Sequence, residues 1–101
     1  MARQKRVTVY ATVRTYAGNS EMVDALVDHE ADVKSLISGI EGFKAYYVIR
    51  TADGTATVSV YDSQAGADAS TAAAAAWIAA NLPDLAGSAP VVAAGEVVIS
   101  A

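Results

Sequence analysis

The Asp53-Gly54 dipeptide stands between two short segments of β-forming residues, and this junction constrains the fold more than any other feature of the chain. Residues 43–52 precede it and residues 55–61 follow it, and both are rich in β-branched and aromatic side chains. An Asp-Gly pair in this position predicts a β-hairpin with a type I′ turn, which needs positive φ at both central residues. The sequence therefore predicts two antiparallel strands at its centre.

The N-terminal half predicts a strand and then a helix. Residues 7–16 alternate with a period of two, as half-buried strands do. Residues 21–38 place apolar side chains at spacings of three and four, which is typical of a helix with one buried stripe. Asn19 or Ser20 can cap this helix at its start, because their side-chain oxygens accept free backbone N–H groups.

The C-terminal half predicts a second helix and a last strand. Residues 64–82 include an alanine run with high helix propensity, and Asp62 or Ser63 can cap them. Residues 91–100 are rich in valine and predict a strand. We expect Gly95 to form a bulge or kink within that strand.

The predicted element order is βαββαβ, without a linker or an internal repeat. This order is that of the ferredoxin-like fold, an α+β architecture in which a four-stranded antiparallel sheet carries two helices on one face. We expect residues 1–101 to form a single domain, because 101 residues leave no room for two.

The strands carry large apolar side chains on both faces, whereas two helices can cover only one face. Residues 46–49 and 97–99 are consecutive large apolar residues, and Tyr10 and Tyr16 of the first strand are expected to point outward. We therefore expect a homodimer that pairs two copies through the open sheet face. The alternative, a monomer whose exposed Tyr and Val side chains are tolerated in water, remains open at this point.

Composition narrows the partners further. The net charge of −4 argues against a nucleic-acid partner, which would need concentrated Lys and Arg beyond the single cluster Arg3, Lys5 and Arg6. No apolar run is long enough for a membrane span, so we expect a cytoplasmic protein without a membrane partner. One histidine and no cysteine leave no metal-ligand cluster, and we expect neither a metal nor a cofactor.

Three stretches of the sequence resemble a known family. They are Gly42 to Tyr47 after the first helix, Asp53 to Thr55 with the strand Val58 to Asp62, and Ala76 to Pro83 at the end of the second helix. With the element order, they make the chain similar to the dimeric α+β barrel superfamily, in particular to small proteins related to antibiotic biosynthesis monooxygenases. The resemblance implies two sheets that pair face to face in a barrel.

The same resemblance implies two classes of function. Members of the superfamily include cofactor-independent oxygenases of aromatic polyketides, heme-degrading oxygenases and proteins with no known activity. The heme-degrading members carry an Asn on strand one, a Trp on strand three and a His in the second helical region, and this sequence has none of them at those places. We therefore expect either a cofactor-independent monooxygenase-like enzyme acting on a small aromatic compound, or a non-catalytic small-molecule-binding or structural homodimer.

Four residues are candidates for a ligand pocket: Tyr47, Arg50, Tyr61 and Trp77. Three aromatic rings and one fixed cation would suit a flat phenolic or quinone-like ligand. In the alternative interpretation, the aromatic side chains belong to the core and Arg50 pairs with a carboxylate at the surface or at the dimer seam.

Two further titratable residues have candidate roles. His29 is the only histidine, lies on the apolar stripe of the first helix, and could act as a catalytic general base near neutral pH. The alternative is a neutral histidine in the core or at its rim. Glu96 is the one charge inside the last strand, and we expect it to form a structural ion pair with Arg14 or Arg50.

Overall fold

The computed structural model describes residues 9–87 and 89–101. The basic cluster Arg3, Lys5 and Arg6, and the expected start of the first strand at Val7, lie outside these residues. The helices and strands follow in the order β1 (Tyr10–Ala17), α1 (Ser20–Asp28), α2 (Glu30–Ser38), β2 (Phe43–Arg50), β3 (Gly54–Tyr61), α3 (Gln64–Asn81) and β4 (Val91–Glu96). The predicted order βαββαβ is confirmed, with the first helix divided in two.

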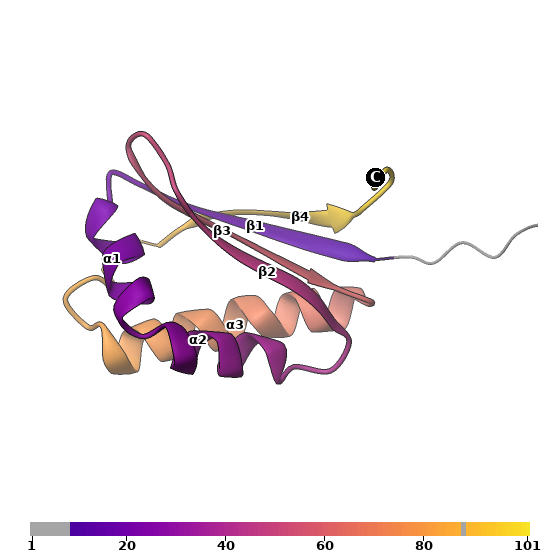
Figure 1. Ribbon diagram of the computed structural model, residues 1–101, viewed down its shortest axis with the longest axis horizontal. Helices are drawn as coiled ribbons and strands as arrows, with labels where there is room; N and C mark the ends of the chain where they lie inside the picture. Colours follow the sequence, from indigo (N-terminus) through magenta and orange to yellow (C-terminus); the bar gives the residue numbers. More distant parts are fainter. Residues whose placement is uncertain (1–8, 88) are drawn as a thin grey trace, which may run out of the picture.

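The four strands form one antiparallel sheet in the order β2-β3-β1-β4. α1, α2 and α3 all lie against one face of this sheet, and no helix of the described residues covers the opposite face (Figure 1). β1 and β3 form the centre and pair residue for residue, from Tyr10 with Tyr61 to Ala17 with Gly54. This is the predicted ferredoxin-like α+β architecture.

β1 presents its faces in the opposite sense to the prediction. Thr12, Arg14 and Tyr16 are buried on the face that the helices cover, whereas Val13 is exposed on the open face. The expectation that Tyr10 and Tyr16 point outward is wrong, because Tyr16 belongs to the buried core and Tyr10 packs against it. The more polar side of the strand therefore faces the helices.

The hairpin between β2 and β3 is present, but its turn differs from the predicted one. The loop holds residues 51–53, because β3 already begins at Gly54. Neither Asp53 nor Gly54 has positive φ, so this is not a type I′ turn. A glycine is required at position 54 for another reason: a Cβ there would collide with the carbonyl oxygen of Tyr16 on β1.

The helices begin as expected but the first one is interrupted. The helix predicted over residues 21–38 is divided into α1 and α2 at His29, whose φ of −112° and ψ of 31° are not helical. Asn19 caps α1 and Ser63 caps α3, each through a side-chain oxygen that accepts a backbone N–H bond of 3.1 Å. Within the described ranges, no helix is both long enough and apolar enough to cross a membrane.

β4 is shorter and more regular than predicted. It pairs with β1 without a register shift from Val91 to Glu96, so the expectation of a bulge or kink at Gly95 is wrong. A register shift occurs instead on β2, between Phe43 and Ala45.

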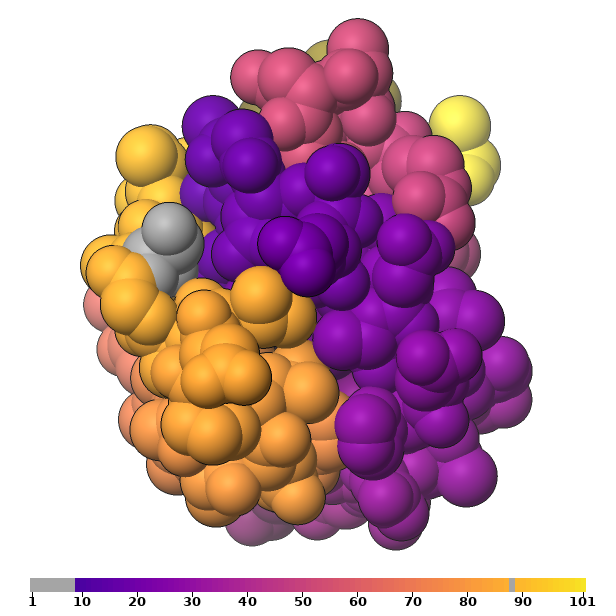
Figure 2. Space-filling model, turned by 90° about the vertical axis from the view of Figure 1, so that its left-hand side faces the viewer, coloured from indigo at the N-terminus to yellow at the C-terminus, as the bar shows by residue number. Residues whose placement is uncertain are grey.

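The core lies between the helices and the sheet in two clusters. One holds Tyr16, Met22, Leu26, Val33 and Ile78, and the other holds Ile37, Tyr61 and Ala67. Tyr46 packs against both clusters. At one end of the molecule, Leu82 and Leu85 of the segment after α3 pack against the first cluster, where that segment lies beside α1 (Figure 2).

Candidate functional site

Arg14 is the centre of the candidate site. It lies on the helix-covered face of β1, and only 1% of its surface is exposed. Its guanidinium donates hydrogen bonds to four hydroxyl groups, from Nε to Thr57 Oγ1 (3.1 Å), from Nη1 to Ser70 Oγ (3.3 Å) and Thr71 Oγ1 (2.9 Å), and from Nη2 to Ser59 Oγ (2.6 Å). Because two of these hydroxyls belong to β3 and two to α3, the cation joins the sheet to the helix.

The charge of Arg14 is not balanced by a neighbouring carboxylate. Among residues 9–87 and 89–101, the ion pairs are Lys34 with Glu30 and Arg50 with Asp24. Burial lowers the pKa of Arg14, but a guanidinium stays protonated in proteins at neutral pH. A buried charge without a counter-ion costs free energy, and such groups are characteristic of functional sites.

Three tyrosines near Arg14 do not supply the missing negative charge. Burial raises the pKa of Tyr46 to about 12, although the positive charge of Arg14 acts in the opposite direction. Burial also raises the pKa of Tyr16 and of Tyr61. All three phenols therefore keep their protons at neutral pH, and their hydroxyls can donate hydrogen bonds.

A cavity of about 350 Å³, which we name the Arg14 cavity, lies between α3, the segment before β4, and the edge of the sheet. Its polar lining residues are Arg14, Tyr16 and Thr71. The rest of its lining is apolar and consists of Ala75, Ile78, Ala79, Ala86, Ala89, Pro90 and Val92. Arg14 thus lies at the wall of a largely apolar chamber, with only a small part of its side chain exposed there.

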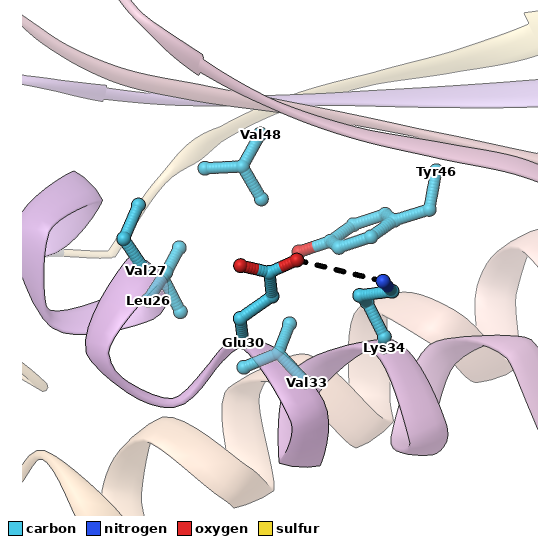
Figure 3. A pocket seen from close by; sticks show the side chains of 7 residues that line it. All are labelled: Leu26, Val27, Glu30, Val33, Lys34, Tyr46 and Val48. Atoms are coloured by element: carbon cyan, nitrogen blue, oxygen red, sulfur yellow. Dashed lines mark hydrogen bonds and ion pairs between the residues drawn. The ribbon is translucent and has the colours of Figure 1, made fainter.

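A second cavity of about 190 Å³ lies at the other side of the core and is lined by Leu26, Val27, Glu30, Val33, Lys34, Tyr46 and Val48. In Figure 3, the hydroxyl of Tyr46 points toward the carboxylate of Glu30, which pairs with Lys34 at 3.5 Å. Between the two cavities, the space beside Trp77 and Arg14 holds only about 20 Å³, room for about one water molecule. The centre of the core is therefore filled by side chains.

The four predicted pocket residues Tyr47, Arg50, Tyr61 and Trp77 do not line one common space. Tyr47 is 59% exposed on the open face, whereas Tyr61 is buried on the opposite face and donates a 2.6 Å hydrogen bond to a carbonyl of α2. Arg50 pairs with Asp24 at 2.8 Å on the surface, as the alternative interpretation predicted. Of the four, Trp77 lines the small space beside Arg14.

His29 lies at the junction of α1 and α2. Its Nδ1 is 2.9 Å from the carbonyl oxygen of Ala25, and its ring packs edge-on against Trp77, with the ring centroids 5.4 Å apart. His29 lines neither the Arg14 cavity nor the cavity of Figure 3. Its role as a general base stays a prediction.

Arg14 itself was not predicted to belong to the site, because we expected Glu96 to pair with Arg14 or Arg50. Glu96 is exposed and forms no ion pair within the described residues. The sequence does contain a pattern that locates Arg14 in the site. Arg14 is the only charge in residues 7–16, and residues 55–59 place hydroxyls at every second position. Pairing these two strands would put the cation among the hydroxyls.

No protein-family model matches the sequence, and no curated protein matches it. Solved structures do match. One is a protein of unknown function from Nitrosomonas europaea, with a TM-score of 0.66 and 24% identity over 93% of this chain and 92% of that one.

Two further matches carry descriptions. SnoaB, a cofactor-independent oxygenase from Streptomyces nogalater, matches with a TM-score of 0.54 and 12% identity over 95% of this chain and 96% of that one. A dimeric ferredoxin-like protein from an uncultured marine organism matches with a TM-score of 0.53 and 13% identity over 95% and 91%. The predicted resemblance to dimeric α+β barrel proteins is therefore confirmed for the fold.

Proposed function

We propose that residues 1–101 form a single domain that acts as a homodimer and binds a small aromatic compound in the Arg14 cavity. The observation that carries this proposal is an apolar chamber that ends on a buried cation, for which the described part of the chain supplies no counter-ion. Ligand sites typically measure about 300–1,000 Å³ and combine apolar walls with a few polar groups that fix orientation. At about 350 Å³, the Arg14 cavity suits a compound of two or three fused rings.

A pair of substitutions on α3 tests where the ligand binds. Ala79 lines the Arg14 cavity and Ala80 does not, although both are exposed residues of the same helix. Ala79→Leu should weaken the binding of flat aromatic compounds at least tenfold, whereas Ala80→Leu should bind as the native protein does. Fluorescence of Trp77, the only tryptophan, and calorimetry would follow binding. Native affinity in Ala79→Leu would contradict the proposed site.

The homodimer is proposed from the open face of the sheet. Four large apolar side chains are exposed there: Val13 (37%), Tyr47 (59%), Ile49 (42%) and Val91 (73%). The strand register places Tyr47 beside Val58 and Val13, and it places Ile49 and Val91 in line with Ala56 and Thr15. The four side chains therefore lie on one face of the sheet, opposite the buried Arg14. A stable interface buries roughly 800 Å² per partner, which a four-stranded sheet face can provide. The match to a protein described as dimeric supports a second copy as the partner.

Cofactor-independent oxygenation of a small aromatic compound is a second candidate function, favoured by the structural match to SnoaB. With His29 as the base, the reaction would take place outside the Arg14 cavity, which His29 does not line. In such a reaction, a base removes a proton from an activated CH₂ group and the carbanion reacts with O₂. One oxygen atom then forms the product ketone and the other leaves as water. Since Nδ1 of neutral His29 must donate to the Ala25 carbonyl, Nε2 is its basic nitrogen.

Oxygen uptake with a panel of polycyclic phenols and ketones tests this second candidate. His29→Ala should abolish uptake while the dimer is preserved. Unchanged uptake would remove His29 from the mechanism. If no compound that binds supports uptake, the protein is a binding protein and not an oxygenase.

A further inference from the structure

We propose that Arg14 binds a negatively charged oxygen of the ligand, a carboxylate, phenolate or enolate attached to a flat apolar body. This inference rests on the proposed function, because it concerns the ligand of the same cavity. It specifies the chemistry that the cavity selects.

The polar side chains that line the Arg14 cavity favour an anionic ligand. Arg14, Tyr16 and Thr71 all supply hydrogen-bond donors, and no carboxylate lines the cavity within the described residues. Thr71 Oγ1 accepts from Arg14, so its own O–H remains available to donate. Three donors, one of them cationic, complement an anion better than a neutral or cationic ligand.

The guanidinium of Arg14 has more N–H donors than the described residues supply acceptors. It has five N–H donors, and the four hydroxyl contacts use four of them. Among residues 9–87 and 89–101, one N–H of Nη2 therefore has no hydrogen-bond partner. Each of the four hydrogen bonds of Arg14 is made to a neutral hydroxyl oxygen. An anionic oxygen that reaches Nη2 from the Arg14 cavity would satisfy both the free donor and the uncompensated charge.

Keeping Arg14 buried without a ligand costs free energy. A buried ion that loses its partner typically destabilises a fold, whereas an apolar residue of similar volume is often tolerated at such a place. The hydroxyls of β3 and α3 hold the guanidinium in one position, but they leave its charge uncompensated. A ligand that brings the counter-charge explains both the cation and the cavity beside it.

The test compares two ligands of equal shape that differ in charge, 2-naphthoate and 2-naphthamide. Calorimetry on the native protein should show that the acid binds roughly 10- to 100-fold more tightly than the amide, as expected for a charge-assisted hydrogen bond. Arg14→Met has a similar volume and no charge, and it should bind both ligands equally. Thr71→Val keeps Arg14 and should reduce the preference for the acid only partly, so the test holds even if Arg14→Met does not fold.

The outcomes separate this inference from the proposed function. If the acid and the amide bind the native protein equally, Arg14 does not recognise an anion, although the cavity still binds aromatic compounds. A folded Arg14→Met protein that keeps the full preference for the acid would also overturn the inference. If neither ligand binds, both the inference and the proposed function are wrong.

Discussion

At the scale of single residues, Gly54 decides how β1 meets the central hairpin. The backbone of Gly54 lies so close to Tyr16 that a Cβ would collide with the Tyr16 carbonyl oxygen, which cannot move without disturbing β1. Gly95 on β4 is different, because a Cβ there meets no atom within 4 Å. The same amino acid is therefore indispensable at one position and replaceable at the other.

Gly54→Ala should lower the free energy of unfolding by about 1–3 kcal/mol, the usual cost of forcing an extra group into a packed site. Gly95→Ala should change it by less than about 0.5 kcal/mol. Urea denaturation of the two variants checks both values. Equal stability of the two variants would contradict the close approach of β1 and β3.

Tyr46 gives a pH-dependent prediction. Because burial raises its pKa from 10 to about 12, the unfolded chain releases this proton between pH 10 and pH 12 while the folded protein keeps it. The contribution of Tyr46 to stability is therefore complete below pH 10 and is lost as the pH rises to 12. Tyr46→Phe should make the alkaline decline in unfolding free energy shallower. An unchanged decline would show that Tyr46 is not buried as described.

At the scale of elements, β1 and β3 each place a buried threonine on the helix-covered face, and the two differ in their hydrogen bonding. Thr12 Oγ1 is buried and has no hydrogen-bond partner in the part of the chain that the structure describes, whereas Thr57 Oγ1 accepts from Arg14 Nε. A buried hydroxyl without a hydrogen-bond partner destabilises the folded state. Removing a hydroxyl that accepts a hydrogen bond is also destabilising, because it leaves the donor without a partner. The two positions should therefore respond oppositely to the same substitution.

Thr12→Val should raise the free energy of unfolding by about 1 kcal/mol, because it replaces an unsatisfied hydroxyl with a methyl group of similar size. Thr57→Val should lower it by about 1–3 kcal/mol, because it leaves a guanidinium N–H unpaired. Chemical denaturation would measure both. Changes of the same sign would contradict either the unsatisfied hydroxyl of Thr12 or the hydrogen bond from Arg14 to Thr57.

Much of the element structure could be predicted from the sequence, because periodicity and capping are local properties. The caps at Asn19 and Ser63 and the start of β2 at Phe43 follow from local patterns. The division of the first helix at His29 could not be predicted, because the apolar stripe continues through it. At this division the imidazole contacts the Ala25 carbonyl and Trp77, which lies far away in the sequence.

The orientation of β1 and the position of Arg14 could not be predicted for a different reason. The rule that apolar side chains point inward identifies the helix-covered face of a strand only when the other face of the sheet is exposed to water. Here Val13 and Tyr47 are apolar on the open face, while Thr12 and Arg14 are polar on the covered face. When both faces are expected to be buried, alternation identifies the strand but not which of its faces meets the helices.

At the scale of the whole molecule, the two faces of the sheet have separate roles in the proposed function. The helix-covered face holds the core and the Arg14 cavity, and the open face is left for a second copy of the chain. Light scattering behind a sizing column should show a particle of twice the chain mass at micromolar concentration. A monomer at that concentration would contradict the proposed homodimer.

Ile49→Lys should convert the dimer to a monomer, because it places a charge in the apolar surface of the open face. Val27→Lys is the matched control, since Val27 is also exposed (56%) but lies on α1, away from the open face. This control should remain dimeric in the same light-scattering measurement. Dissociation of both variants, or of neither, would place the interface elsewhere.

The most direct test of the Arg14 cavity as an anion site is the NMR signal of the Arg14 Nε–H group during a titration with 2-naphthoate. We expect the Arg14 signal to shift on addition of 2-naphthoate and to shift much less on addition of 2-naphthamide. The signal of Arg50, which lies on the surface, should stay in place with both ligands. Binding of 2-naphthoate that leaves the Arg14 signal unchanged would contradict the proposed site and its preference for an anion.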